Sequence, residues 1–125
     1  MVNWIKKETL SKPVLTISDK FFSFNTNATY YLNDFMSVRV GMDDNYLYIQ
    51  GIKKKDLERN TYFDDSIFKI YQGKGYSRIA SKDLLLLVDN NFESKYKITD
   101  NLPCKFEGEY IPKENLLRFN IGGIK

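Results

Sequence analysis

Residues 37–50 read SVRVGMDDNYLYIQ, and apolar side chains in this stretch alternate with other side chains on both sides of an acidic turn. A two-residue turn at 44–45 places Val40 opposite Ile49 and gathers the apolar side chains on one face. The stretch therefore predicts a β-hairpin with a core-facing inner side and an outer side. We expect the inner side to consist of Val38, Val40, Met42, Leu47 and Ile49.

The elements around this hairpin are predicted to occur twice, each time as strand, turn, strand, short helix and hairpin. In the first copy, Thr26 or Asn25 caps a helix that ends at Leu32; in the second, Ser81 caps a helix over 82–88. The positions that we expect to be equivalent are 55 residues apart, and they are Phe24 and Ile79, Thr26 and Ser81, and Leu32 and Leu87.

The remaining strands follow from short β-branched and aromatic runs between turn residues. They are predicted at 14–17 and 21–24 in the first copy, and at 67–71 and 76–79 in the second, with a closing hairpin of 105–111 and 116–121. In that hairpin, a four-residue turn directs Phe106, Tyr110, Leu117, Phe119 and Ile121 inward and places Glu109 opposite Arg118.

These repeats predict a β-dominated α+β fold in which two hairpin and short-helix units pack around a shared core. We expect an N-terminal arm at 1–12, a first unit at 13–52, a basic linker at 53–66 and a second unit at 67–125. Residues 13–125 then form one compact domain. The alternative is that any strand-rich chain yields matches of this kind, without a duplication.

The composition excludes several classes of enzyme. The 125 residues include no histidine and one cysteine, Cys104, so histidine general bases, catalytic triads, Cys-His pairs and ordinary zinc sites are excluded. The acidic pairs Asp43-Asp44 and Asp64-Asp65 are typical of turns, and a hard cation is the alternative. We expect a non-catalytic protein without a cofactor or a metal.

The chain also lacks the sequence signals of export and of membrane insertion. No apolar run approaches the ~20 residues that cross a bilayer, and no hydrophobic signal segment follows the first residues. A cytoplasmic protein without membrane contact is expected.

Two stretches resemble the AbrB/MazE-type swapped-hairpin family. Residues 73–84, GKGYSRIASKDL, are similar to the family's Lys-Gly turn, inward Ile and helix start, and residues 38–43, VRVGMD, resemble its following strand. The first copy departs from the family, with Asp19-Lys20 in place of Lys-Gly and Asn25 where proline is usual. Neither copy has the family's Gly-Asp turn before its hairpin.

The resemblance implies a fold in which two copies interleave their hairpins, here as a tandem copy within one chain. It also implies a DNA-binding transcriptional regulator or antitoxin that contacts double-stranded DNA with basic side chains near the strand turns. The candidate DNA-binding residues are Lys20, Arg39, Lys74 and Arg78, with Lys53, Lys54 and Lys55 as a flanking basic stripe.

The charge balance keeps a second function open. Residues 1–60 carry 9 basic and 7 acidic side chains, and residues 61–125 carry 10 and 9, so neither half is strongly basic. The alternative is a small inhibitory or accessory protein of a phage or mobile element that acts by protein–protein contact, because Tyr and Arg are enriched at interaction hot spots. Its interface would contain Arg39, Tyr46 and Tyr48, and a homodimer is a further candidate assembly.

Overall fold

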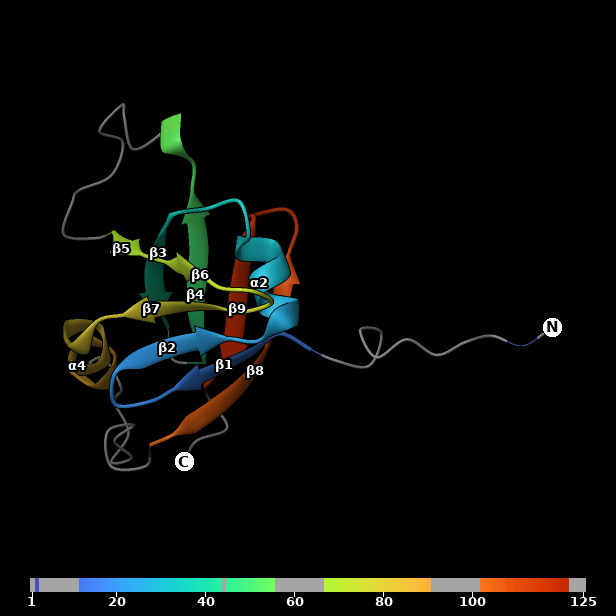
Figure 1. The fold of residues 1–125 in the computed structure, drawn as a ribbon. Helices are drawn as coiled ribbons and strands as arrows, with labels where there is room; N and C mark the ends of the chain where they lie inside the picture. Colours follow the sequence, from blue (N-terminus) through green and yellow to red (C-terminus); the bar gives the residue numbers. More distant parts are fainter. Residues whose placement is uncertain (1, 3–11, 44, 56–66, 91–101, 122–125) are drawn as a thin grey trace.

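The computed structural model describes residues 2, 12–43, 45–55, 67–90 and 102–121 (Figure 1). Most of the expected N-terminal arm and of the basic linker lies outside these residues. The described elements are β1 (Val14–Ile17), β2 (Phe21–Phe24), α2 (Thr26–Leu32), β3 (Ser37–Met42), β4 (Tyr46–Ile52), β5 (Phe68–Lys69), β6 (Tyr71–Gln72), β7 (Ser77–Ala80), α4 (Lys82–Asn90), β8 (Cys104–Ile111) and β9 (Leu116–Asn120). The β-dominated architecture expected from the sequence is confirmed.

The first predicted hairpin has the register that the alternation indicates. Val40 pairs with Ile49, and Met42 pairs with Leu47. The side chains of Val38, Leu47 and Ile49 are buried, while those of Val40 and Met42 are partly buried against the same core. The inner face of β3 and β4 is therefore the predicted one.

The closing hairpin is confirmed in the same way. Glu109 pairs with Arg118 and Tyr110 with Leu117 across β8 and β9. Of the side chains predicted to face inward, Tyr110 is partly buried and the others are buried. The turn residues Pro112, Lys113, Glu114 and Asn115 are all exposed.

The described strands form a nearly closed antiparallel sheet in the order β5-β3-β4-β9-β8-β1-β2-β7-β6. The two ends of this order, β5 and β6, are neighbours in the chain and are separated by Ile70 alone. The segment 68–72 therefore pairs with β3 through its first part and with β7 through its second part. In Figure 1, β1, β2 and β7 cross in front of β3, β4 and β9 at a steep angle.

The prediction of a single strand at 67–71 is wrong, because Ile70 separates β5 from β6. The side chain of Ile70 is buried, and its N–H donates at 3.1 Å to the carbonyl of Met36, the residue that continues the register of β3 with β5. This inward bend lets one short segment join two different strands. Residue 67 lies outside the strand.

The four hairpins β1-β2, β3-β4, β6-β7 and β8-β9, together with the short strand β5, pair with one another only between the two halves of the described chain. β1 pairs with β8, β2 with β7, β3 with β5, and β4 with β9. Each of these pairings joins a strand from residues 13–52 to a strand from residues 67–121. Neither half closes its own sheet.

The two helices correspond to each other with a spacing of 56 residues. Asn25 caps α2, and the Oγ of Ser81 accepts from the N–H of Leu84 in the same way at the start of α4. The buried side chains Ala28, Thr29 and Leu32 of α2 correspond to Leu84, Leu85 and Val88 of α4.

The predicted equivalence of Leu32 with Leu87 is therefore wrong by one residue. Leu87 is 49% exposed, and Val88 occupies the buried position. The spacing of 55 does hold for the strands, where Phe24 and Ile79 both face the core. One additional residue, Ala80, lies between the last inward side chain of β7 and the cap Ser81, which changes the spacing. Helix α4 also continues beyond Val88 to Asn90.

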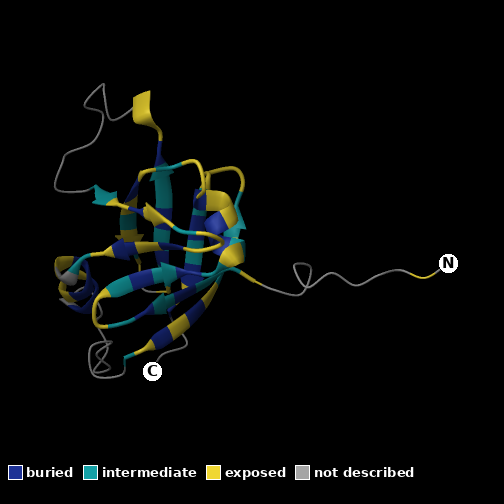
Figure 2. Cartoon of the chain, in the orientation of Figure 1, coloured by how far each residue is buried: buried dark blue, intermediate teal, exposed yellow. Residues whose placement is uncertain are grey.

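The core lies inside the curved sheet and beneath the two helices (Figure 2). Phe22, Phe24 and Phe119 are among its largest fully buried side chains. The rings of Phe24 on β2 and Phe119 on β9 lie 6.0 Å apart, so side chains from both halves fill one core. Full burial of one such side chain contributes roughly 1.5–3 kcal/mol. The cysteine, Cys104, is buried in this core.

Candidate nucleic-acid interface

The outer surface of β1, β2, β7 and β6 brings together three of the predicted DNA-binding residues. We call it the β2–β7 face. Because Leu15, Phe22 and Ile79 point into the core, their strand neighbours point outward. The cross-strand register then places one continuous outward row on this face, which consists of Lys105, Thr16, Ser23, Arg78 and Tyr71.

Arg78 is the central cation of the β2–β7 face. It is exposed on β7, and its guanidinium carbon lies 4.5 Å from the centre of the Phe21 ring on β2. This contact leaves the charge at the surface while the ring holds the guanidinium over the strand pair.

Lys20 and Lys74 lie at opposite ends of the same strand pair. Lys20 directly precedes β2, and Lys74 lies in the turn between β6 and β7. The turn at Lys74 is held by a 2.8 Å bond from the Gly73 N–H to the Tyr76 carbonyl and by another from the Thr26 Oγ1 to the Gly75 carbonyl. Since β2 has four residues at ~3.3 Å each, about 13 Å or more separates the two lysines along the strand.

Acidic side chains are absent from the strands of this face. None of the residues of β1, β2, β6 and β7, all of which the structure describes, is an Asp or a Glu. The described acidic residues that adjoin these strands in the chain or in the sheet include Asp19 in the β1–β2 turn, Glu107 on the neighbouring strand β8 and Asp83 in the first turn of α4, which follows β7. The strands of this face therefore carry basic but no acidic side chains, whereas the whole chain mixes 19 basic with 16 acidic residues, for a net charge of +3.

The other predicted site residues lie on different strands. Arg39, Tyr46 and Tyr48 lie on the outer surface of β3 and β4, and Lys53, Lys54 and Lys55 follow the end of β4. Arg39 donates from its Nε to the Oε1 of Gln50 at 2.6 Å. The seven predicted cations are thus divided between two regions, of which the β2–β7 face holds Lys20, Lys74 and Arg78.

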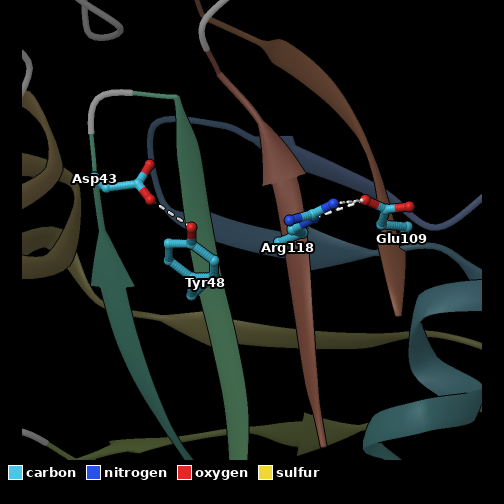
Figure 3. A network of polar contacts seen from close by, with 4 residues as sticks. All are labelled: Asp43, Tyr48, Glu109 and Arg118. Carbon is cyan, nitrogen blue, oxygen red and sulfur yellow. Dashed lines mark hydrogen bonds and ion pairs between the residues drawn. The ribbon is translucent and has the colours of Figure 1, made fainter. Parts of the chain in front are cut away.

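Tyr48 belongs to the turn of the first hairpin. Its hydroxyl donates to Oδ2 of Asp43, while Oδ1 of Asp43 accepts from the backbone N–H groups of Asn45 and Tyr46 (Figure 3). The hydrogen bond from Tyr48 and that from the Asn45 N–H lower the pKa of Asp43 below its usual value. The same bond to Asp43 raises the pKa of Tyr48. Asp43 therefore stabilises a turn, as the sequence indicates.

Tyr46 and Arg118 form a second outer cluster beside this turn. The Arg118 guanidinium lies 4.5 Å from the centre of the Tyr46 ring, and its Nε donates to Oε1 of Glu109 at 2.6 Å (Figure 3). The hydrogen bond to Glu109 raises the pKa of Arg118, so the guanidinium stays charged. This confirms the predicted pairing of Glu109 with Arg118, and it occupies both side chains.

A tyrosine cluster around α2 is not evident from the sequence. The rings of Tyr31 on α2 and Tyr110 on β8 are stacked, with centroids 4.1 Å apart and an interplanar angle of 10°. The neighbouring Tyr30 is 76% exposed and meets Tyr31 edge to face at 5.1 Å. Residues 31 and 110 are brought together only by the pairing of the two halves, so no local sequence signal could have identified the stack.

Within the described parts of the chain, no group of three or more His, Cys, Asp or Glu side chains is placed to hold a metal ion. Among the described helices, none has the length and apolar character needed to cross a membrane. No family model, curated protein or solved structure matches this chain.

Proposed function

We propose that the protein is a non-catalytic, cytoplasmic DNA-binding protein of the regulator or antitoxin type that contacts duplex DNA through the β2–β7 face. The observation that carries this proposal is the position of Lys20, Arg78 and Lys74 along one outward strand pair without acidic side chains. Lysine and arginine on such a surface neutralise phosphates and position a protein on DNA.

The dimensions of the face support a duplex as the ligand. The two turn lysines are about 13 Å or more apart, and the major groove of B-DNA is ~12 Å wide. A lysine at each end can therefore contact phosphates on the two sides of the groove, with Arg78 between them. Strand pairs are an established way of reading a groove.

The strand pairings support the swapped-hairpin pseudo-dimer that the family resemblance implies. All pairings between hairpins join the first unit to the second, and the order of strands and helices repeats. Under this arrangement, Ser23 and Arg78 are equivalent positions, and they are paired directly across β2 and β7. The turn lysines Lys20 and Lys74 then occupy related ends of one surface.

The test is fluorescence anisotropy with mixed-sequence duplexes at low salt. We expect dissociation constants of about 1–100 μM and a log–log salt slope of about −3, for three phosphate contacts. Lys74→Ala combined with Arg78→Ala should weaken binding at least fivefold, while Lys113→Ala, an exposed lysine in the β8–β9 turn, should not. Equal loss in both variants, or no binding, would contradict the proposal.

A second candidate function rests on the Tyr46–Arg118 cluster. Here an arginine is held over a tyrosine ring on the outer surface of β4 and β9, with Tyr48 also on β4 and Arg39 on the adjacent strand β3. Rigid Tyr and Arg side chains are frequent hot spots of protein interfaces, which fits an inhibitory or accessory protein of a phage or mobile element. Capture of one protein partner from nuclease-treated lysate, lost in Tyr46→Ala and retained in Arg78→Ala, would favour this function over DNA binding.

A further inference from the structure

The stacked pair Tyr31–Tyr110 separates two surface grooves, since both rings line both of them. One groove carries mixed charges, including Lys12, Glu107 and the paired Glu109 and Arg118. The other, which we call the Lys53–Lys55 groove, has a volume of about 470 Å³. Its described lining residues are Tyr31, Phe35, Gln50, Gly51, Lys53, Lys55, Tyr110 and Asn115.

The Lys53–Lys55 groove combines positive charge with aromatic rings. Two of its described lining residues are lysines, three are aromatic, and none is acidic. The volume lies within the range of ~300–1,000 Å³ in which proteins bind small ligands or parts of larger ones. A ligand that fits this lining carries negative charges beside flat rings.

The aromatic wall is held in place by the fold. Phe35 lies against the backbone of Gly51, because a Cβ at that position would meet the Cγ and Cδ2 atoms of the ring at 2.4 Å. The carbonyl of Phe35 accepts from Nε2 of Gln72 at 2.9 Å, and the hydroxyl of Tyr110 donates to Oδ1 of Asn115 at 3.0 Å. One face of the Phe35 ring is thus fixed on glycine, while the side chain lines the groove.

We propose that the Lys53–Lys55 groove binds single-stranded nucleic acid, with bases against Phe35, Tyr31 and Tyr110 and phosphates against Lys53 and Lys55. Rings and cations in one groove are the two components by which proteins hold unpaired strands. A duplex does not fit this description, because its bases are stacked inside and cannot lie on protein rings. The site shares no residue with the β2–β7 face, so it is independent of the proposed duplex binding.

The test uses the full-length protein and fluorescently labelled strands of ten nucleotides in DNA and RNA forms, together with an abasic strand of the same length. Each base that stacks on an aromatic ring should strengthen binding about fivefold or more, so the abasic strand should bind at least fivefold more weakly. Preference for the RNA strand over the DNA strand identifies which form the groove accepts better. Equal binding of the abasic strand, or of polyglutamate, would overturn the proposal.

Matched variants locate the binding. Lys53→Ala combined with Lys55→Ala changes only exposed side chains and should weaken single-strand binding at least fivefold. The variant Tyr31→Leu keeps an apolar side chain on α2 and should abolish the preference for the strand that carries bases. Lys74→Ala combined with Arg78→Ala should leave single-strand binding within about twofold of wild type. If Lys74→Ala combined with Arg78→Ala instead weakens single-strand binding, the Lys53–Lys55 groove is not the binding site.

Discussion

The side chain of Asn25 joins the first turn of α2 to the segment that leads into β1. Its Oδ1 accepts from the N–H groups of Ala28 and Val14, at 3.0 and 2.9 Å. Its Nδ2 donates to the carbonyl of Lys12 at 2.9 Å. The cap of α2 and the start of β1 are therefore held by one amide side chain.

We predict that Asn25→Ala lowers the free energy of unfolding by roughly 2–3 kcal/mol, because it removes a helix cap and two further hydrogen bonds. Asn25→Asp keeps the accepting oxygen and should cost less. Asn33→Ala, at the exposed C-terminal end of α2, is the control and should remain within about 0.5 kcal/mol of wild type. Urea denaturation measures all three, and an equal effect of the alanine variants would refute the role of Asn25.

The hydrogen bond between Tyr48 and Asp43 predicts that the stability of the protein falls at both low and high pH. Because the pKa of Asp43 is lowered in the folded protein, its contribution to stability is present above its unfolded pKa of about 3.9 and is lost as pH falls through the lower folded value. Because the pKa of Tyr48 is raised, its contribution is present below about 10 and is lost as pH rises through the higher folded value.

We predict that Tyr48→Phe raises the pKa of Asp43, since it removes the hydrogen bond that lowers this pKa most. NMR titration of the Asp43 carboxyl carbon gives this pKa directly. Tyr46→Phe is the control, because the contact of Asp43 with residue 46 is to its backbone N–H. An unchanged Asp43 pKa in Tyr48→Phe would show that the bond does not form in solution.

Among the elements, β8 connects the two parts of the sheet. Residues 104–107 pair with β1, and residues 108–111 pair with β9. Gly108 lies where the partner changes, and its N–H donates to the carbonyl of Pro13 at 2.8 Å. A Cβ there would lie 2.3 Å from the carbonyl oxygen of Arg118, so the close approach of the two strands requires glycine.

We predict that Gly108→Ala destabilises the protein by about 1–3 kcal/mol, because the added methyl group forces β8 and β9 apart. Gly41→Ala is the matched control, since the nearest atom to its added Cβ, the Cβ of Tyr48, is 4.0 Å away. Thermal unfolding of both variants tests this. A Gly108→Ala protein as stable as Gly41→Ala would contradict the proposed contact between the strands.

The hairpins could be predicted from the sequence because their alternation and turns are local. The alternation around 44–45 determines the register of β3 and β4, and the pairing of Glu109 with Arg118 follows from a four-residue turn. The break at Ile70 could not be predicted, since an apolar residue between two strand-forming segments also fits an unbroken strand. Only the positions of β3 and β7 on either side require the chain to bend there.

The candidate site was predictable in part for the same reason. Lys20 and Lys74 are recognisable from the sequence because they lie in turns, and Arg78 because it follows one. The separation of Arg39 from these residues depends on the order of strands in the sheet, which no local pattern encodes. The Tyr31–Tyr110 stack depends on that order as well.

In the whole molecule, strands of one half pair with strands of the other, so we predict that neither half folds stably without the other. Residues 1–60 and 61–125, prepared as separate chains, should each lack cooperative unfolding as monomers, because every pairing between hairpins would be lost. Mixing the two chains should restore the near-UV circular dichroism of the intact protein. Sedimentation shows whether a separate chain is a monomer. A cooperatively folded monomer of either half would show that this half folds without the other and would contradict the prediction.

The claim that the protein binds DNA through the β2–β7 face can be tested by NMR chemical-shift mapping during titration with a mixed-sequence duplex at low salt. DNA binding through the β2–β7 face predicts that the largest shifts occur at Lys20, Ser23, Tyr71, Lys74 and Arg78 and fade together as salt is raised. Shifts concentrated at Tyr46, Tyr48 and Arg118, or no shifts at millimolar duplex, would contradict the claim.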